Sequence, residues 1–262
     1  MKCPNPLLFL VIIVSFLTAC AISKDSIGSL ETCRSLVDKS ENNKAIECYT
    51  KEVNTNPELA QAYIVRGVLF EEQGSFDKAI EDYGKALQIE KDQSKITSLF
   101  GMRAAAYAQS KNYSRAVEDF TNAISRGDKE SDTFDLRGFS YAMLGDSDHA
   151  IADYIQAISA SPDNAEAYAH LGNEYAKKED YNKAIAEYDK AIKLVPDDAS
   201  YYFNRGLAYA KKKDFDLAIR DLEQALTFNP NFGIAKELLE KVKTSELLHE
   251  RLDFSTQPQV TQ

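Results

Sequence analysis

The sequence lacks the motifs on which most enzyme active sites depend. It contains no glycine-rich phosphate loop, no nucleophile elbow and no Cys-x-x-Cys pair. Its three histidines, His149, His170 and His249, share no metal-ligand spacing with carboxylates or thiols. Each is therefore expected to be a solvated or helix-surface residue. We expect a protein without catalytic residues, metal or cofactor.

Positive charge is also scarce. The chain has 31 Lys and Arg residues against 41 Asp and Glu residues, which gives a formal net charge of −10. Such a balance argues against nucleic acid as a partner and against electrostatic attachment to anionic lipid head groups.

The sequence has little uninterrupted hydrophobic character outside its N-terminus. Lys2 precedes an apolar run from Leu7 to Leu17, which is too short for a comfortable membrane span and suits a secretory signal peptide. The run ends in the sequence Leu17-Thr18-Ala19-Cys20. These four residues resemble the lipobox of bacterial lipoproteins. A plain secretory signal and an uncleaved anchor are the alternatives.

The lipobox resemblance implies a lipid anchor. In that family the signal, here residues 1–19, is cleaved before the cysteine, so Cys20 would carry acyl chains on its sulfur and amino group. Two or three acyl chains are enough for stable membrane attachment. Residues 20–26 then form a short tether. Ala21 follows Cys20, and in enteric-type bacteria a residue other than Asp at this position implies sorting to the outer membrane.

A repeating pattern dominates the rest of the chain. An aromatic residue, Gly or Ala, a second aromatic, Ala, a third aromatic and Ala return at fixed offsets from Tyr63 to Ala225. One unit reads Tyr168, Leu171, Gly172, Tyr175, Ala184, Tyr188, Ala191 and Pro196. The apolar spacing predicts two amphipathic helices per unit. Turn residues separate them, namely Gly74, Asn112, Gly145, Asp180 and Asp214.

This pattern resembles the tetratricopeptide repeat (TPR), a helix-turn-helix unit of about 34 residues. The resemblance implies an all-α fold, a right-handed superhelical solenoid of TPR hairpins. Its expected parts are a degenerate repeat at 27–59, five units at 60–93, 97–130, 131–164, 165–198 and 199–232, a capping helix at 233–252 and a disordered tail at 253–262. Three extra residues near 91–96 predict a loop insertion. The capping helix would pack through Ile234, Leu238, Leu239, Val242, Leu247 and Leu248.

Arginine and aspartate recur in pairs 16 residues apart, one on each helix of a hairpin. The pairs are Arg66 with Asp82, Arg103 with Asp119, Arg137 with Asp153 and Arg205 with Asp221. Where Leu171 replaces the arginine, Glu187 replaces the aspartate. Four copies at repeat positions favour half-buried ion pairs that fix hairpin register over acid-base chemistry.

Two cysteines remain in the predicted mature fold. Cys33 and Cys48 lie on the two helices of the degenerate repeat, with Cys33 where other units have Gly. In an oxidising compartment a disulfide between them is expected. The alternative is a pair of buried thiols that pack as small hydrophobic groups.

The TPR resemblance places the binding site on the concave face, lined by the first helix of each hairpin. Carried over position by position, the lining is Ile64, Glu71, Glu72, Asp132, Asp135, Phe139, Met143, Asn173, Lys177, Phe203, Asn204, Leu207 and Lys211. Phe139 and Phe203 are not needed at the repeat's packing positions, which makes them candidate contacts.

Two interpretations of the lysines on this face stay open. Lys177 and Lys211 either oppose the macrodipole at helix C-termini or hold an acidic, carboxylate-bearing segment. Chaperone-binding TPR domains hold such a carboxylate with a Lys and two Asn. Asn173 and Asn204 fit the two Asn, but Ala169 stands at the position of the Lys, so the clamp is incomplete.

We therefore expect a non-catalytic protein-interaction scaffold. It resembles lipid-anchored TPR adaptors of the bacterial cell envelope that recruit cell-wall enzymes or proteases, on the periplasmic face of the outer membrane. The alternative is an assembly factor or pilotin-like chaperone for secretin, pilus or outer-membrane barrel components. An adaptor would bind folded protein partners, with a homodimer as one option, and an assembly factor would hold an extended peptide segment.

Overall fold

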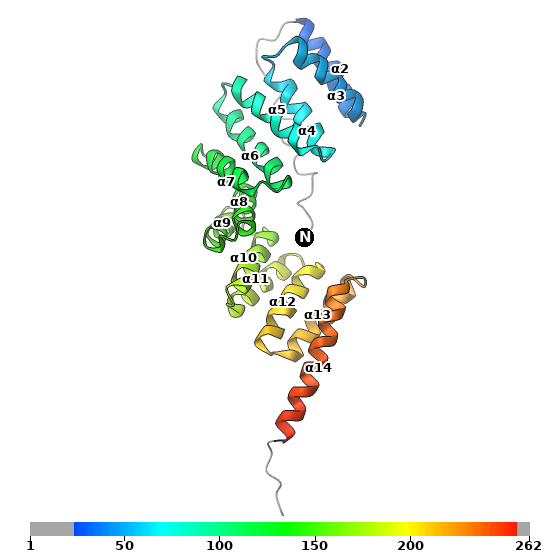
Figure 1. The fold of residues 1–262 in the computed structure, drawn as a ribbon, viewed down its shortest axis with the longest axis vertical. Helices are drawn as coiled ribbons and strands as arrows, with labels where there is room; N and C mark the ends of the chain where they lie inside the picture. Colours follow the sequence, from blue (N-terminus) through cyan, green and yellow to red (C-terminus); the bar gives the residue numbers. More distant parts are fainter. Residues whose placement is uncertain (1–23, 256–262) are drawn as a thin grey trace, which may run out of the picture. The chain divides into compact units, whose positions relative to one another are not determined.

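The computed structural model describes residues 24–255 (Figure 1). The predicted signal peptide, Cys20 and most of the predicted tail lie outside the described residues. Within the described range every regular element is an α-helix, so the predicted all-α fold is confirmed. The helices are α2 Lys24–Asp38, α3 Asn42–Thr55, α4 Ala60–Glu72, α5 Phe76–Ile89, α6 Gln93–Gln109, α7 Tyr113–Ser125, α8 Ser131–Met143, α9 Ser147–Ala160, α10 Ala165–Lys177, α11 Tyr181–Leu194, α12 Ala199–Lys212, α13 Phe215–Phe228 and α14 Gly233–Ser255.

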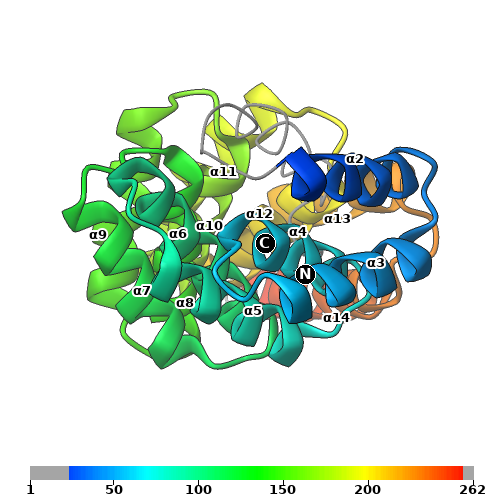
Figure 2. The same cartoon turned by 90° about the horizontal axis from the view of Figure 1, so that it is seen from above.

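Consecutive helices pair as antiparallel hairpins, and the chain divides into two compact units after Asp128. Unit 1 holds the hairpins α2–α3, α4–α5 and α6–α7, and unit 2 holds α8–α9, α10–α11 and α12–α13 followed by α14. The hairpins α2–α3 and α12–α13 are visible as pairs of adjacent coils in Figure 1, and Figure 2 shows the same cartoon from above. Within each unit neighbouring hairpins pack on one another, because one hairpin cannot bury its apolar face alone.

Glycine in the first helix lets the second helix approach closely. A Cβ atom at Gly67 would lie 2.7 Å from Cε1 of Tyr83, and one at Gly172 would lie 2.7 Å from Cε1 of Tyr188. Both tyrosines are buried. The two positions are equivalent in their repeats, so the same small-against-large packing holds both hairpins together.

Each hairpin turns through one residue in the left-handed region, immediately before the N-cap of the second helix. These residues are Ser40, Gly74, Lys111, Gly145, Glu179 and Lys213. In three hairpins the N-cap side chain then accepts a backbone hydrogen bond from the second helix, at Asn112, Asp146 and Asp180. The predicted turn positions are confirmed.

The predicted arginine–aspartate pairs form as bidentate ion pairs between the two helices of a hairpin. Arg137 donates from Nε and Nη2 to the two carboxylate oxygens of Asp153, each at 2.7 Å. The same geometry recurs at Arg66–Asp82, Arg103–Asp119 and Arg205–Asp221. Where the arginine is missing, Leu171 is buried and Glu187 pairs with Lys190 on its own helix.

Two predictions of detail are wrong. The three extra residues before the repeat at 97–130 do not form a loop. Helix α6 begins at Gln93 and gains a turn, and the Asp92 side chain accepts hydrogen bonds from the amides of Ser94 and Lys95 as its N-cap. Ile234 does not pack in the capping helix and is 56% exposed. The predicted Leu239 and Val242 are buried against α13 together with Ala235, where Ala218 and Leu222 complete the cluster. The predicted Leu247 and Leu248 lie outside the residues whose side chains the structure describes.

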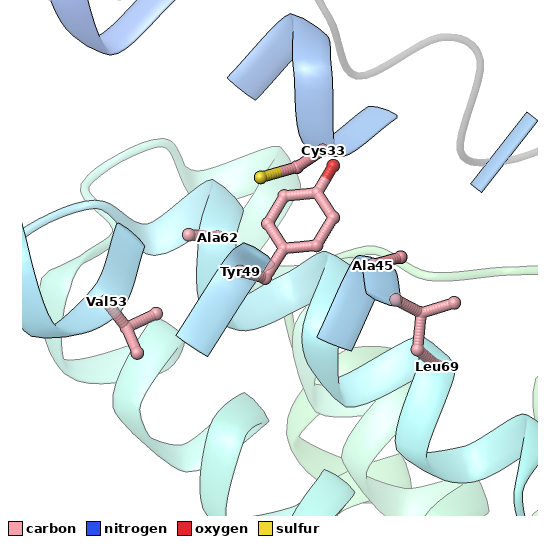
Figure 3. Close-up of a cluster of buried hydrophobic side chains, with 6 residues drawn as sticks. All are labelled: Cys33, Ala45, Tyr49, Val53, Ala62 and Leu69. Carbon is pink, nitrogen blue, oxygen red and sulfur yellow. The ribbon is translucent and has the colours of Figure 1, made fainter. Parts of the chain in front are cut away.

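The N-terminal hairpin is joined covalently. A disulfide connects Cys33 of α2 with Cys48 of α3, with their Cα atoms 5.5 Å apart. Cys33 is fully buried beside Tyr49, in a cluster that reaches α4 (Figure 3). The members of this cluster are Cys33, Ala45, Tyr49, Val53, Ala62 and Leu69. This hairpin therefore shares its core with the repeat that follows it.

Candidate protein-binding face

In unit 2 the first helices of three successive hairpins, α8, α10 and α12, present side chains at equivalent repeat positions. We call this set the first-helix face. It comprises Asp135, Phe139 and Met143 on α8, His170, Asn173 and Lys177 on α10, and Phe203, Asn204, Leu207 and Lys211 on α12. The equivalent positions differ from repeat to repeat, as in the row Phe139, Asn173 and Leu207, whereas the packing glycines at 138, 172 and 206 do not change.

A histidine–carboxylate contact joins α8 to α10 on this face. Asp135 is buried, and its Oδ1 lies 3.0 Å from Nδ1 of His170. The imidazole ring lies 5.3 Å from the Tyr154 ring and 6.2 Å from the Phe139 ring, measured between centroids. The expectation that His170 is a solvated surface residue is wrong, because its side chain is only 30% exposed.

An amide network joins α10 to α12. Asn173 Oδ1 accepts from the Tyr188 hydroxyl at 2.8 Å and from Asn204 Nδ2 at 3.2 Å. His170 and Asn204 occupy the same repeat position, and each reaches back to the preceding first helix. Successive first helices are therefore tied together by side chains that also form the surface.

The two lysines of the face are in different environments. Lys177 pairs with Glu174, a buried carboxylate that also accepts from the Ser147 hydroxyl at 2.7 Å. Lys211 is exposed and forms no ion pair with the described side chains. A carboxylate ligand would thus find the charge of Lys177 already compensated and that of Lys211 available.

The two candidate phenylalanines are partly buried. Phe203 packs against the α13–α14 cluster, with its ring 5.0 Å from that of Phe232, so it does serve packing, contrary to expectation. Phe139 contacts His170 instead. Met143 lies at the end of α8, and its side chain is 47% exposed.

The predicted positions in unit 1 are occupied by structural contacts. Ile64 packs against the buried cluster of α4 and α5. Glu71 accepts from the Tyr83 hydroxyl at 2.9 Å, and burial raises the pKa of its carboxyl although this hydrogen bond opposes the rise. Glu72 accepts from Asn42 Nδ2 at 2.9 Å. Ile64 and Glu71 are thus engaged in packing and hydrogen bonding, whereas Glu72 stays exposed.

Sequence reasoning missed His170 as a member of this face and Glu174 as the buried partner of Lys177. Nothing in the sequence indicated that Glu174 is buried, since a carboxylate on a helix is usually solvated. His170 did have a signal, because it follows Asp135 by 35 residues, close to one repeat, which places the two side chains on neighbouring first helices.

Residues 24–255 contain no helix that is both long and apolar enough to cross a membrane. In the same part of the chain no three His, Cys, Asp or Glu side chains are grouped so as to hold a metal ion.

Known structures share the fold. YrrB, described as a TPR protein with an unusual peptide-binding site, is 22% identical, with a TM-score of 0.61 over 74% of this chain and 99% of YrrB. MamA is 25% identical, with a TM-score of 0.60 over 66% of this chain and 93% of MamA. The C-terminal part of a TPR repeat-containing protein from Cytophaga hutchinsonii is 19% identical, with a TM-score of 0.69 over 82% of this chain and 88% of that one.

One curated protein is similar over a short segment. A UDP-N-acetylglucosamine–peptide N-acetylglucosaminyltransferase of Giardia intestinalis is 35% identical over 52 residues. The match covers 20% of this chain and 4% of the transferase.

Family models identify the repeats themselves. A model described as "TPR repeat" matches residues 138–178 and 172–213, and one described as "Tetratricopeptide repeat" matches residues 60–93 and 199–232. The ranges 60–93 and 199–232 coincide with the hairpins α4–α5 and α12–α13, and the two ranges of the first model run from α8 to α12. The chain therefore contains tetratricopeptide repeats.

Proposed function

We propose that the chain is a non-catalytic protein-interaction scaffold that acts as an adaptor in a bacterial cell envelope, held to a membrane through a lipid on Cys20. The observation that carries the scaffold role is the first-helix face of unit 2. Its positions vary between repeats while the packing positions stay constant, as expected where one framework presents a specific surface.

The proposed partner lies across α8, α10 and α12. The cross-helix contacts Asp135–His170 and Asn173–Asn204 order the face before binding, which lowers the entropic cost of association. The half-exposed Met143 supplies apolar contact, and Lys211 supplies a positive charge for an acidic or carboxylate-bearing segment.

The binding role is tested by photo-crosslinking in cells. A photoreactive residue is placed at Met143, which is 47% exposed, and separately at Ile155 of α9, which is 43% exposed and lies on a second helix. We expect Met143 to capture specific envelope proteins that Ile155 does not. Identical adducts, or none from Met143, would contradict the assignment of the face.

The same experiment separates adaptor from assembly factor. Capture of a cell-wall hydrolase or protease supports the adaptor, whereas capture of a secretin, pilus or barrel component supports the assembly role.

The contribution of positive charge to binding is tested by Lys211→Glu. The control is Lys193→Glu, because Lys193 is an exposed lysine on α11. Only the first change should weaken binding of the captured partner, and equal affinities would remove the acidic segment from the proposal.

The anchor requires its own test, because Cys20 lies outside the described residues. Cells fed a labelled fatty acid should incorporate the label into the native chain and not into Cys20→Ser. The variant should also leave the membrane fraction. Unchanged labelling and fractionation of the variant would reject the lipoprotein proposal without affecting the scaffold.

A further inference from the structure

His170 is one of the side chains that join the hairpins α8–α9 and α10–α11 of unit 2. It extends from α10 to the Asp135 carboxylate of α8, 3.0 Å away, and its ring packs beside Tyr154 of α9. The contact therefore connects the hairpin α8–α9 to the hairpin α10–α11. Both partners are largely withdrawn from solvent, with side-chain exposures of 30% for His170 and 9% for Asp135.

The groups that surround this imidazole are mostly acidic. Asp132 and Asp135 come from α8, and Glu166 and Glu174 come from α10 itself. The neighbouring helices add tyrosines and one further carboxylate, namely Tyr154 of α9, Tyr188 of α11, and Tyr201 with the N-cap Asp198 of α12. Lys177 pairs with Glu174, and Arg137 pairs with Asp153. The imidazole is thus the group placed to balance Asp135.

The electrostatics follow from this arrangement. Burial alone would lower the pKa of His170, but the Asp135 carboxylate, with Glu166 and Glu174, raises it above its ordinary value. Burial raises the pKa of Asp132 and of Glu166. A cluster of carboxylates is costly to keep charged in a partly buried site unless a cation lies among them.

We propose that the His170–Asp135 contact is a pH-dependent link between these two hairpins. When the imidazole is protonated, the contact is a charged hydrogen bond that offsets the repulsion among Asp132, Asp135 and Glu166. When the imidazole loses the proton from Nε2, Nδ1 still donates to the Asp135 carboxylate. The donor is then uncharged, so the hydrogen bond is weaker and the face has lost one positive charge.

The direction of the pH effect follows from linkage. A histidine whose pKa is higher in the folded state than in the unfolded state adds stability that is fully present below the unfolded pKa. That contribution is lost as pH rises through the folded pKa of His170. Unit 2 should therefore be most firmly held in mildly acidic solution and loosen as the solution becomes alkaline.

The chain offers a matched control. His149 also contacts an aspartate, with Nδ1 2.7 Å from Oδ2 of Asp146. Both residues belong to the N-terminus of α9, and the side chain of His149 is 66% exposed. His149→Gln should remove a histidine–aspartate pair without removing a link between hairpins.

The first measurement is the titration of the histidine ring signals by NMR in the unaltered chain, which requires no variant to fold. His170 should titrate above the ordinary value of roughly 6.5, and Asp135→Asn should move its pKa downward. Titration of His170 at or below that value in the unaltered chain would overturn the proposal.

The second measurement is urea unfolding followed by circular dichroism at about pH 5.5 and about pH 8.5, on either side of the ordinary histidine pKa. The midpoint of the unaltered chain should fall with rising pH. His170→Gln should reduce this fall, whereas His149→Gln should retain it. An equal fall in both variants would show that His170 does not control the stability of unit 2.

Discussion

At the scale of the residue, the left-handed position in each hairpin turn is the clearest local constraint. Six residues adopt positive φ at equivalent points, yet only two of them, Gly74 and Gly145, are glycine. The other four hairpins accept the steric cost that a Cβ atom carries in this region, about 1 kcal/mol or more per residue. The turn geometry is therefore imposed by helix packing.

This strain predicts a stabilising substitution. Glu179 is exposed and has φ of 61°, so Glu179→Gly should raise the free energy of unfolding by about 1 kcal/mol in urea denaturation. The control is Lys178→Gly, because Lys178 has φ of −81° and gains nothing from glycine. Equal effects of the two changes would show that backbone strain is not the cause.

The buried ion pairs predict a second effect. Asp153→Ala leaves the guanidinium of Arg137 without its bidentate partner, at 16% side-chain exposure, and should destabilise unit 2 by about 3–5 kcal/mol. Glu187→Ala removes the acid at the equivalent position of the next repeat. Its partner Lys190 is 52% exposed and can be solvated by water, so no buried charge is left unpaired and the change should cost at most about 1 kcal/mol. Thermal unfolding of the two variants measures the difference.

Residue-scale contacts were predictable where they repeat and not where they occur once. The spacing of 16 residues was enough to pair Arg66 with Asp82 and its equivalents, since each copy supports the others. The His170–Asp135 contact occurs once, so its separation of 35 residues, close to one repeat, had no second copy to support it. The pairing of Lys177 with a buried Glu174 was hidden for the same reason.

At the scale of the element, the helix boundaries follow from turn and capping residues. Asp92 explains why the three extra residues lengthen α6, because its side chain caps a new first turn before the repeat's usual start. Length alone had suggested a loop. An insertion next to a strong N-cap residue is accommodated as helix when its residues tolerate helical geometry, as Gln93 to Ile96 do.

The disulfide makes the α2–α3 hairpin depend on redox conditions. For a bridge between residues 15 apart, reduction should cost about 3 kcal/mol. In a chain that begins at Ala21, hydrogen exchange of α2 and α3 should accelerate in reductant while that of α12 and α13 stays constant. The unfolded, unreduced chain should expose no reactive thiol, and two equivalents would mean that the bridge does not form.

At the scale of the whole molecule, each hairpin depends on its neighbours within a unit. The last hairpin is covered by α14, whose Leu239 and Val242 bury apolar surface worth about 3–6 kcal/mol together. Ending the chain after Phe232 should therefore speed hydrogen exchange in α12 and α13 while α4 and α5 keep their protection. Uniform acceleration throughout would contradict this nearest-neighbour dependence.

The architecture was predictable because a repeat reports the same packing rule several times. Equivalent residues such as Gly67 and Gly172 face equivalent tyrosines, so one packing solution recurs in several hairpins. The partner was not predictable, because it depends on the positions that vary, such as Phe139, Asn173 and Leu207. Ile234 illustrates the same limit, because it is 56% exposed although its helical spacing predicted a packed position.

The Cys33–Cys48 bridge also determines how the chain bears mechanical load. A pulling force applied at the N-terminal end enters through α2 and reaches the bridge at Cys33. The bond then passes the force directly to α3, and the segment between the cysteines, whose sequence separation is 15 and which would span roughly 50 Å if extended, cannot lengthen. Under tension the α2–α3 hairpin therefore cannot be drawn out between its two cysteines.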